Sequence, residues 1–108
     1  MSAEDKFANA RATIELFNNT LRELQEAPEK VTPQLLVTLL SGTTELLREV
    51  PGFIDDRAEA ARSGDLKLAA IASQIVGQIL TTADQVNLLV ARWKRQHPEI
   101  KLENELEN

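Results

Sequence analysis

The sequence predicts an all-α protein, an antiparallel bundle of three long helices. Apolar residues recur at helical spacing along most of the chain, stop and start signals divide it twice, and no segment shows the alternation of a β-strand. The 108 residues suit a single domain. We place this domain at residues 1–98 and interpret residues 99–108, "EIKLENELEN", as an acidic, flexible tail.

The first helix is expected over about residues 3–27. Ser2 and Asp5 fit a capping box at its start, and Pro28 ends it. Between these signals, apolar residues alternate at spacings of three and four, which is a heptad seam. The seam consists of Phe7, Ala10, Ile14, Phe17, Leu21 and Leu24.

The second helix is expected to begin at Thr32-Pro33, because threonine caps a helix and proline suits its first turn. Gly64 suits a left-handed C-terminal cap, and Asp65 can cap the helix that follows. These residues place the two turns of the bundle near 28–32 and 63–65.

The pair Pro51-Gly52 interrupts the second helix, so we expect a kink or a break there. Proline removes a backbone donor and clashes with the preceding turn. If the second and third helices run antiparallel from a turn near Gly64-Asp65, Gly52 lies at the same height as Gly77. A glycine at position 77 would then leave room for the bent segment. A hinge that moves on binding is one alternative, and a full break, giving four helices, is the other.

The third helix is expected from about Asp65 to Gln96, before Pro98. Its apolar residues cover most of its circumference, so it needs more cover than two neighbouring helices supply. We therefore expect a homo-oligomer, with a homodimer favoured. The predicted interface residues are Ile71, Ile75, Val76, Ile79 and Leu80.

A layer of hydroxyl and amide groups is the first candidate binding site. When the antiparallel helices are aligned about their turns, hydroxyl and amide groups from all three helices lie at similar heights. Together these groups can bind a small ligand. The alternative is a buried polar layer that sets the register of the helices. The predicted ligand-binding residues are Asn18, Ser41, Thr44, Gln85 and Asn87.

The stretch "ARWKRQHPE" is the second candidate, because the cations from Arg92 to His97 flank Trp93 as a stacking face for nucleic acid. Both features also have a structural explanation. The cations complement the C-terminus of the helix, and Trp93 continues its apolar seam.

A group of carboxylates is the third candidate. Asp55, Asp56 and Glu59 could hold a cation or exchange protons. Their close neighbours Arg57 and Arg62 favour a solvated charged surface instead.

Catalytic and metal chemistry has no support in the residues. The chain has no cysteine and only one histidine, His97, and it contains none of the common phosphate-loop, nucleophile-elbow or zinc motifs. We expect no enzyme activity, metal or cofactor. The net charge of −5 argues against nucleic acid as a partner.

No apolar run approaches the roughly 20 residues of a membrane span, and no signal peptide is evident, so a cytoplasmic protein without a membrane partner is expected. In composition the chain resembles small helical-bundle adaptors, inhibitors and chaperones. We therefore expect a non-enzymatic protein that binds a protein partner through a helical face. Binding of a small ligand and contact with nucleic acid are the alternatives.

Overall fold

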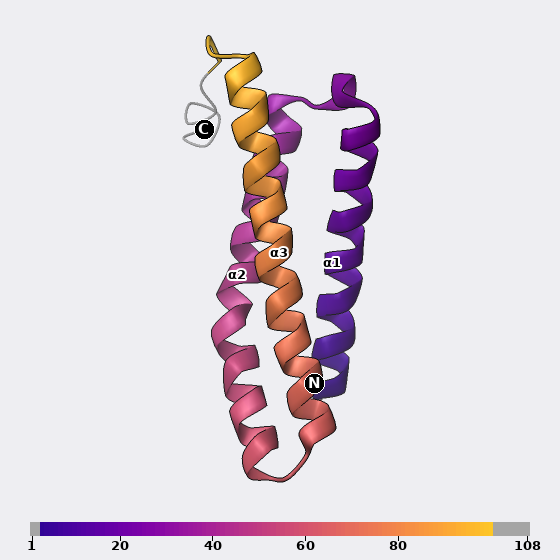
Figure 1. Ribbon diagram of the computed structural model, residues 1–108, viewed down its shortest axis with the longest axis vertical. Helices are drawn as coiled ribbons and strands as arrows, with labels where there is room; N and C mark the ends of the chain where they lie inside the picture. The colour runs from indigo at the N-terminus through magenta and orange to yellow at the C-terminus, as the bar shows by residue number, and fades with distance from the viewer. Residues whose placement is uncertain (1–2, 101–108) are drawn as a thin grey trace.

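The computed structural model describes residues 3–100, which form an antiparallel bundle of three long α-helices (Figure 1). Helix α1 spans Ala3–Glu26, α2 spans Pro33–Arg62 and α3 spans Leu66–Gln96, and the short 3-10 helix η1, Pro28–Lys30, follows α1. Residues 3–100 contain no strand, so the all-α prediction is confirmed. Ser2 of the predicted cap and residues 101–108 of the predicted tail lie outside the described residues.

The predicted helix boundaries rest on local hydrogen bonds that the structure confirms. The Thr32 hydroxyl oxygen accepts from the Leu35 N–H at 3.1 Å and caps α2. The Asp65 carboxylate accepts from the Leu68 N–H at 3.0 Å and caps α3. Between these two helices Gly64 has a φ of 80°, the left-handed conformation that glycine adopts without strain.

Helix α2 passes through Pro51 without a break. Proline has no N–H, so the Leu47 carbonyl cannot receive its usual helical hydrogen bond. Pro51 is exposed, and a helix tolerates such a loss best on the side that water can reach. The alternative of a second helix broken into two is therefore wrong.

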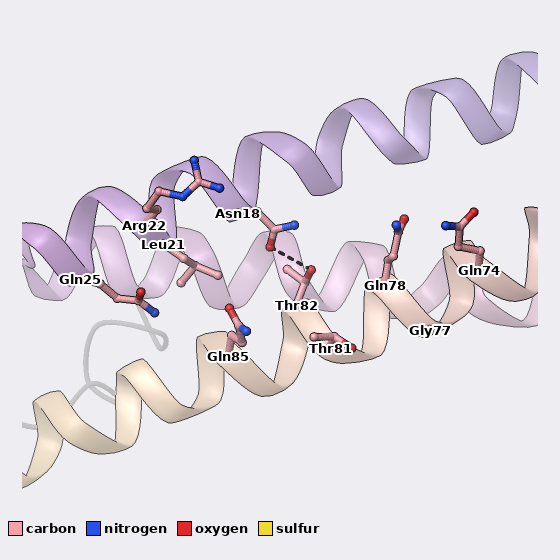
Figure 2. Close-up of a pocket in the computed structure, with 10 residues that line it drawn as sticks. All are labelled: Asn18, Leu21, Arg22, Gln25, Gln74, Gly77, Gln78, Thr81, Thr82 and Gln85. Atoms are coloured by element: carbon pink, nitrogen blue, oxygen red, sulfur yellow. Dashed lines mark hydrogen bonds between the residues drawn. The ribbon is translucent and has the colours of Figure 1, made fainter.

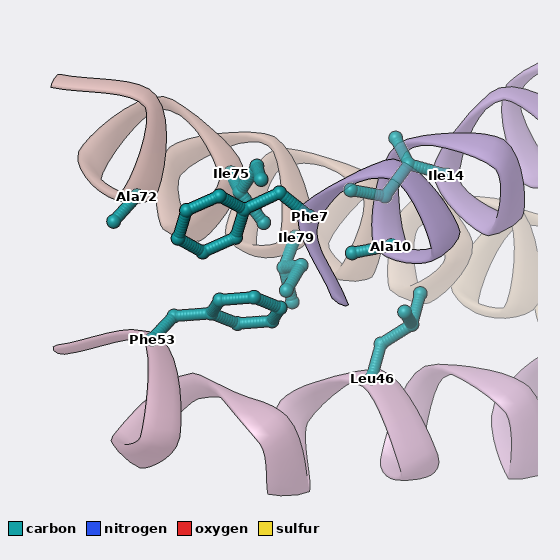
Figure 3. Close-up of a cluster of buried hydrophobic side chains, with 8 residues drawn as sticks. All are labelled: Phe7, Ala10, Ile14, Leu46, Phe53, Ala72, Ile75 and Ile79. Carbon is teal, nitrogen blue, oxygen red and sulfur yellow. The ribbon is translucent and has the colours of Figure 1, made fainter. Parts of the chain in front are cut away.

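Helices α2 and α3 form a hairpin that packs closely along its length, and α1 lies against this hairpin, mainly on α3 (Figure 1). Two apolar clusters fill the space between the helices. The first, drawn in Figure 3, consists of Phe7, Ala10, Ile14, Leu46, Phe53, Ala72, Ile75 and Ile79. The second consists of Leu21, Leu24, Leu36, Leu39, Val86, Val90 and Trp93. The heptad seam of α1 thus supplies residues to both clusters.

Glycine allows a close contact between α1 and α2, and this contact is at Gly42 instead of Gly77. The ring of Phe17 lies directly against Gly42, where a β-carbon would overlap it. A β-carbon on Gly52 would meet the Lys6 ammonium at 3.1 Å, and one on Gly77 would meet nothing within 4 Å. The predicted packing of Gly52 against Gly77 is therefore wrong.

An ion pair and a cation–π contact also join α1 to α2. The Lys6 ammonium lies 2.8 Å from an Asp56 carboxylate oxygen and 4.7 Å from the centre of the Phe53 ring. Asp56 is thus paired with α1 instead of with Arg57 or Arg62. No group of three metal-ligating side chains occurs in the described part of the chain.

Candidate functional site

A mostly apolar surface runs along the hairpin on the side that faces away from α1, with the exposed Asp84 at its edge, and we call it the outer α2–α3 face. From α2 it includes Leu40, Thr44, Leu47, Pro51, Ile54 and Ala58. From α3 it includes Ala69, Ser73, Val76, Leu80 and Asn87. None of these side chains is buried.

The position of this face on α2 follows from helix geometry. Residues two apart on a helix point in nearly opposite directions, because each residue turns the chain by about 100°. Glu45 and Glu49 line a groove shared with α1. Leu47 lies between them in the sequence and therefore points away from α1. By the same argument Ile54 points away from the Gly52 side.

On α3 the same relation holds. Gln74 and Gln78 line a groove shared with α1. Val76 is two residues from both glutamines, and Leu80 is two residues from Gln78, so both apolar side chains point to the opposite flank of α3.

Three large apolar side chains are well exposed on the outer α2–α3 face. Leu47 is 39% exposed, and Ile54 and Leu80 are each 48% exposed. Small or uncharged polar residues lie beside them along each helix, and the exposed Asp55 and Asp84 lie at the edge of the face. An apolar surface rimmed by polar residues is typical of a protein–protein or membrane contact.

The predicted oligomer interface divides between this face and the core. Val76 and Leu80 belong to the outer α2–α3 face. Ile75 and Ile79 are fully buried in the first apolar cluster, and Ile71 packs against that cluster on the side of α1. The prediction is wrong for Ile75 and Ile79, because the protomer's own core already covers them.

Sequence reasoning missed the contribution of α2 to this face. The signal that could have found it is a stripe at spacings of four and three that contains no charged residue, from Leu40 through Leu47 and Ile54 to Ala58. The apolar seam of α2 is adjacent to this stripe, so the two merge when apolar residues alone are counted.

A polar groove of about 610 Å³ lies between α1 and α3 (Figure 2), and we call it the α1–α3 groove. Amide and hydroxyl side chains dominate it. Its lining residues are Asn18, Leu21, Arg22, Gln25, Gln74, Gly77, Gln78, Thr81, Thr82 and Gln85. The buried Thr82 hydroxyl donates to the Asn18 side-chain oxygen at 3.5 Å, across the groove.

The structure brings together only part of the predicted ligand-binding layer. Asn18 and Gln85 both line the α1–α3 groove. Thr44 and Asn87 lie on the outer α2–α3 face, and Ser41 is exposed on α2 outside the groove. The predicted single layer across three helices is wrong, because these side chains lie at similar heights but point in different directions.

The basic end of α3 does not present the predicted stacking face. Trp93 is 6% exposed in the second apolar cluster, and the His97 ring stacks on it with ring centres 4.4 Å apart. The same His97 ring lies 3.1 Å from the Trp93 carbonyl oxygen through its Nδ1. A nucleic-acid base therefore finds no open indole face here.

Helix α3 is, by length and composition alone, apolar enough to cross a membrane, which the count of uninterrupted apolar residues did not reveal. The central helix of a bundle has the same composition, and eight α3 side chains are buried between α1 and α2. No protein-family model, no curated protein and no solved structure matches the chain.

Proposed function

We propose that this protein is a non-enzymatic binding protein, an adaptor, inhibitor or regulator, that assembles as a homodimer through the outer α2–α3 face. The observation that carries the proposal is a mostly apolar face whose α2 stripe, from Leu40 to Ala58, has no charged residue in a chain with 27% charged residues. Leu47, Ile54 and Leu80 stand in the middle of this face, 39% to 48% exposed. Removing such side chains from water is the main favourable term in protein association.

A second copy of the chain suits this face on electrostatic grounds. Each copy carries a net charge of −5, so two copies repel each other wherever their charged surfaces meet. Contact through this face keeps most of the charges apart, with Asp84 at its edge. A twofold axis through the middle of the face would also bring Leu47 and Leu80 close to the same residues of the second copy.

The size of the face predicts a weak dimer. From Leu40 to Ala58 the stripe covers about 27 Å of helix, at about 1.5 Å per residue. With the helix axes about 9 Å apart and each helix about 10 Å wide, the face is about 19 Å across and offers on the order of 500 Å² per protomer. The total of about 1,000 Å² is at the lower limit for a specific interface. We therefore expect dissociation at micromolar concentrations.

The substitution Leu80→Glu tests the proposal. A charge in the middle of the face has to be desolvated in the dimer, so the variant should be monomeric where the wild type is dimeric. Leu88→Glu is the matched control. Leu88 is 64% exposed on the same helix but borders Leu21 and Gln25 on the side of α1. Light scattering at a protein concentration where the wild type is dimeric should show a dimer for this control.

A membrane is the competing partner for an apolar face. If the face bound lipid, the protein would stay monomeric and sediment with neutral phosphatidylcholine vesicles, and Leu80→Glu would abolish the sedimentation. That outcome would contradict the homodimer.

A further inference from the structure

The α1–α3 groove has an unusual chemical lining for a solvated surface of this protein. Helix α3 presents four uncharged polar side chains at spacings of four, three and four, namely Gln74, Gln78, Thr81 and Gln85. Helix α1 adds Asn18, Arg22 and Gln25 from the opposite side (Figure 2). Arg22 is the one charged side chain that lines the groove.

In the described part of the chain, few protein groups bond to the polar side chains of the groove. The Gln74 side-chain oxygen accepts from Arg11 at 3.3 Å, and Asn18 accepts from Thr82 at 3.5 Å. Within residues 3–100, no protein group bonds to the side-chain amides of Gln78 or Gln85. These amides point from α3 into the space between the helices (Figure 2).

Gly77 is a second, independent observation at this groove. A glycine inside a helix is about 1 kcal/mol less favourable than alanine, so it needs a reason. Gly77 has a helical backbone and no packing neighbour, because a β-carbon there would meet nothing within 4 Å. It lines the groove next to Gln78, with Gln74 one turn before it and Thr81 one turn after it. A bare backbone at this point gives a ligand chain room for close approach.

The side chains indicate the chemistry of the ligand. Each glutamine offers one acceptor and a donor group, the same pair that each residue of a peptide backbone presents. From Gln74 to Gln85 the stripe is about 16 Å long at 1.5 Å per residue. About five residues of extended chain cover this length at about 3.3 Å each.

We infer that the α1–α3 groove binds an extended peptide segment of about five residues, with a carboxylate at the end that meets Arg22. Arginine holds a carboxylate through two parallel hydrogen bonds. At the other end of the groove the Arg11 guanidinium already donates to Gln74, and Glu15, one turn before Asn18 on α1, would repel a carboxylate there. The acidic end of the peptide is thereby fixed at Arg22.

This inference rests on the proposed binding function and names its partner class, but it does not need the dimer. The groove and the outer α2–α3 face lie on opposite flanks of α3. The monomeric variant Leu80→Glu should therefore bind peptide as the wild type does.

Nuclear magnetic resonance of the ¹⁵N-labelled full chain tests the inference, with two pools of acetylated hexapeptides as probes. One pool ends in a free carboxylate and the other in an amide. We expect both pools to shift the side-chain signals of Gln78 and Gln85 and the backbone signal of Gly77. The carboxylate pool should bind about tenfold more tightly, and Arg22→Gln should remove this difference.

Gly77→Leu should abolish the shifts while the fold is retained, because a β-carbon at this position meets nothing within 4 Å and the rest of the new side chain enters the groove. Ala91→Leu is the matched control on an exposed part of α3 outside the groove, and it should bind as the wild type does. Absence of shifts with both pools, shifts located elsewhere, or unchanged binding by Gly77→Leu would overturn the inference. If the wild type is a dimer but binds no peptide, the peptide inference fails and the dimer proposal does not. If the wild type is a monomer that binds peptide, the dimer proposal fails and the peptide inference does not.

Discussion

The ring of Phe17 on α1 lies directly against the backbone of Gly42 on α2, so closely that a β-carbon at position 42 would overlap it. This contact sits where α1 crosses from the first apolar cluster to the second, and Phe17 packs against both. The position of α1 on the hairpin therefore depends on the absence of a side chain at 42.

The contact predicts that Gly42→Ala destabilises the protein. The new methyl group must displace a half-buried ring, which costs about 1–3 kcal/mol, while the gain in helix propensity returns at most about 1 kcal/mol. Urea denaturation measures the difference. In a Phe17→Ala background the same change should be stabilising, since only the propensity gain remains. A loss of the same size in both backgrounds would show that the ring is not the obstacle.

Gly77→Ala is expected to have the opposite effect. A β-carbon at 77 meets nothing within 4 Å, so the substitution should raise the free energy of unfolding by about 0.5–1 kcal/mol. Thermal or urea unfolding of the purified variant measures this gain. A clear loss of stability would mean that Gly77 is packed against a neighbour after all.

Ile79→Ala is expected to lower the free energy of unfolding by about 2–5 kcal/mol, because it leaves a cavity in the first apolar cluster. Its sequence neighbour provides the control. Leu80 is 48% exposed, so Leu80→Ala should change the stability of the monomer by less than about 1 kcal/mol. The two variants are compared by urea denaturation at low protein concentration, where dimerisation does not contribute. Equal losses would mean that the two faces of α3 are assigned incorrectly.

The helices and turns could be predicted from the sequence because their causes are local. Thr32 and Asp65 cap helices through hydrogen bonds to residues three positions away, and Gly64 supplies a left-handed conformation that few other residues adopt. The heptad seam of α1 likewise lies within one helix. Such features need no knowledge of the neighbouring helices.

The candidate sites were only partly predictable, because they depend on the directions of side chains around helices in contact. Aligning the antiparallel helices about their turns assigned Asn18 and Gln85 to similar heights, and both line the α1–α3 groove. It could not show that Asn87 points to the other flank of α3. For the same reason Ile75 was not distinguished from Leu80, although the first is buried and the second is exposed.

Light scattering of the wild-type chain at a series of concentrations tests the central claim most directly. The protomer has a mass of 12.0 kDa. We predict a molar mass that rises toward twice this value across about a hundredfold range of micromolar concentrations, as mass action requires for a weak dimer. A mass that stays at 12.0 kDa throughout this range would contradict assembly through the outer α2–α3 face.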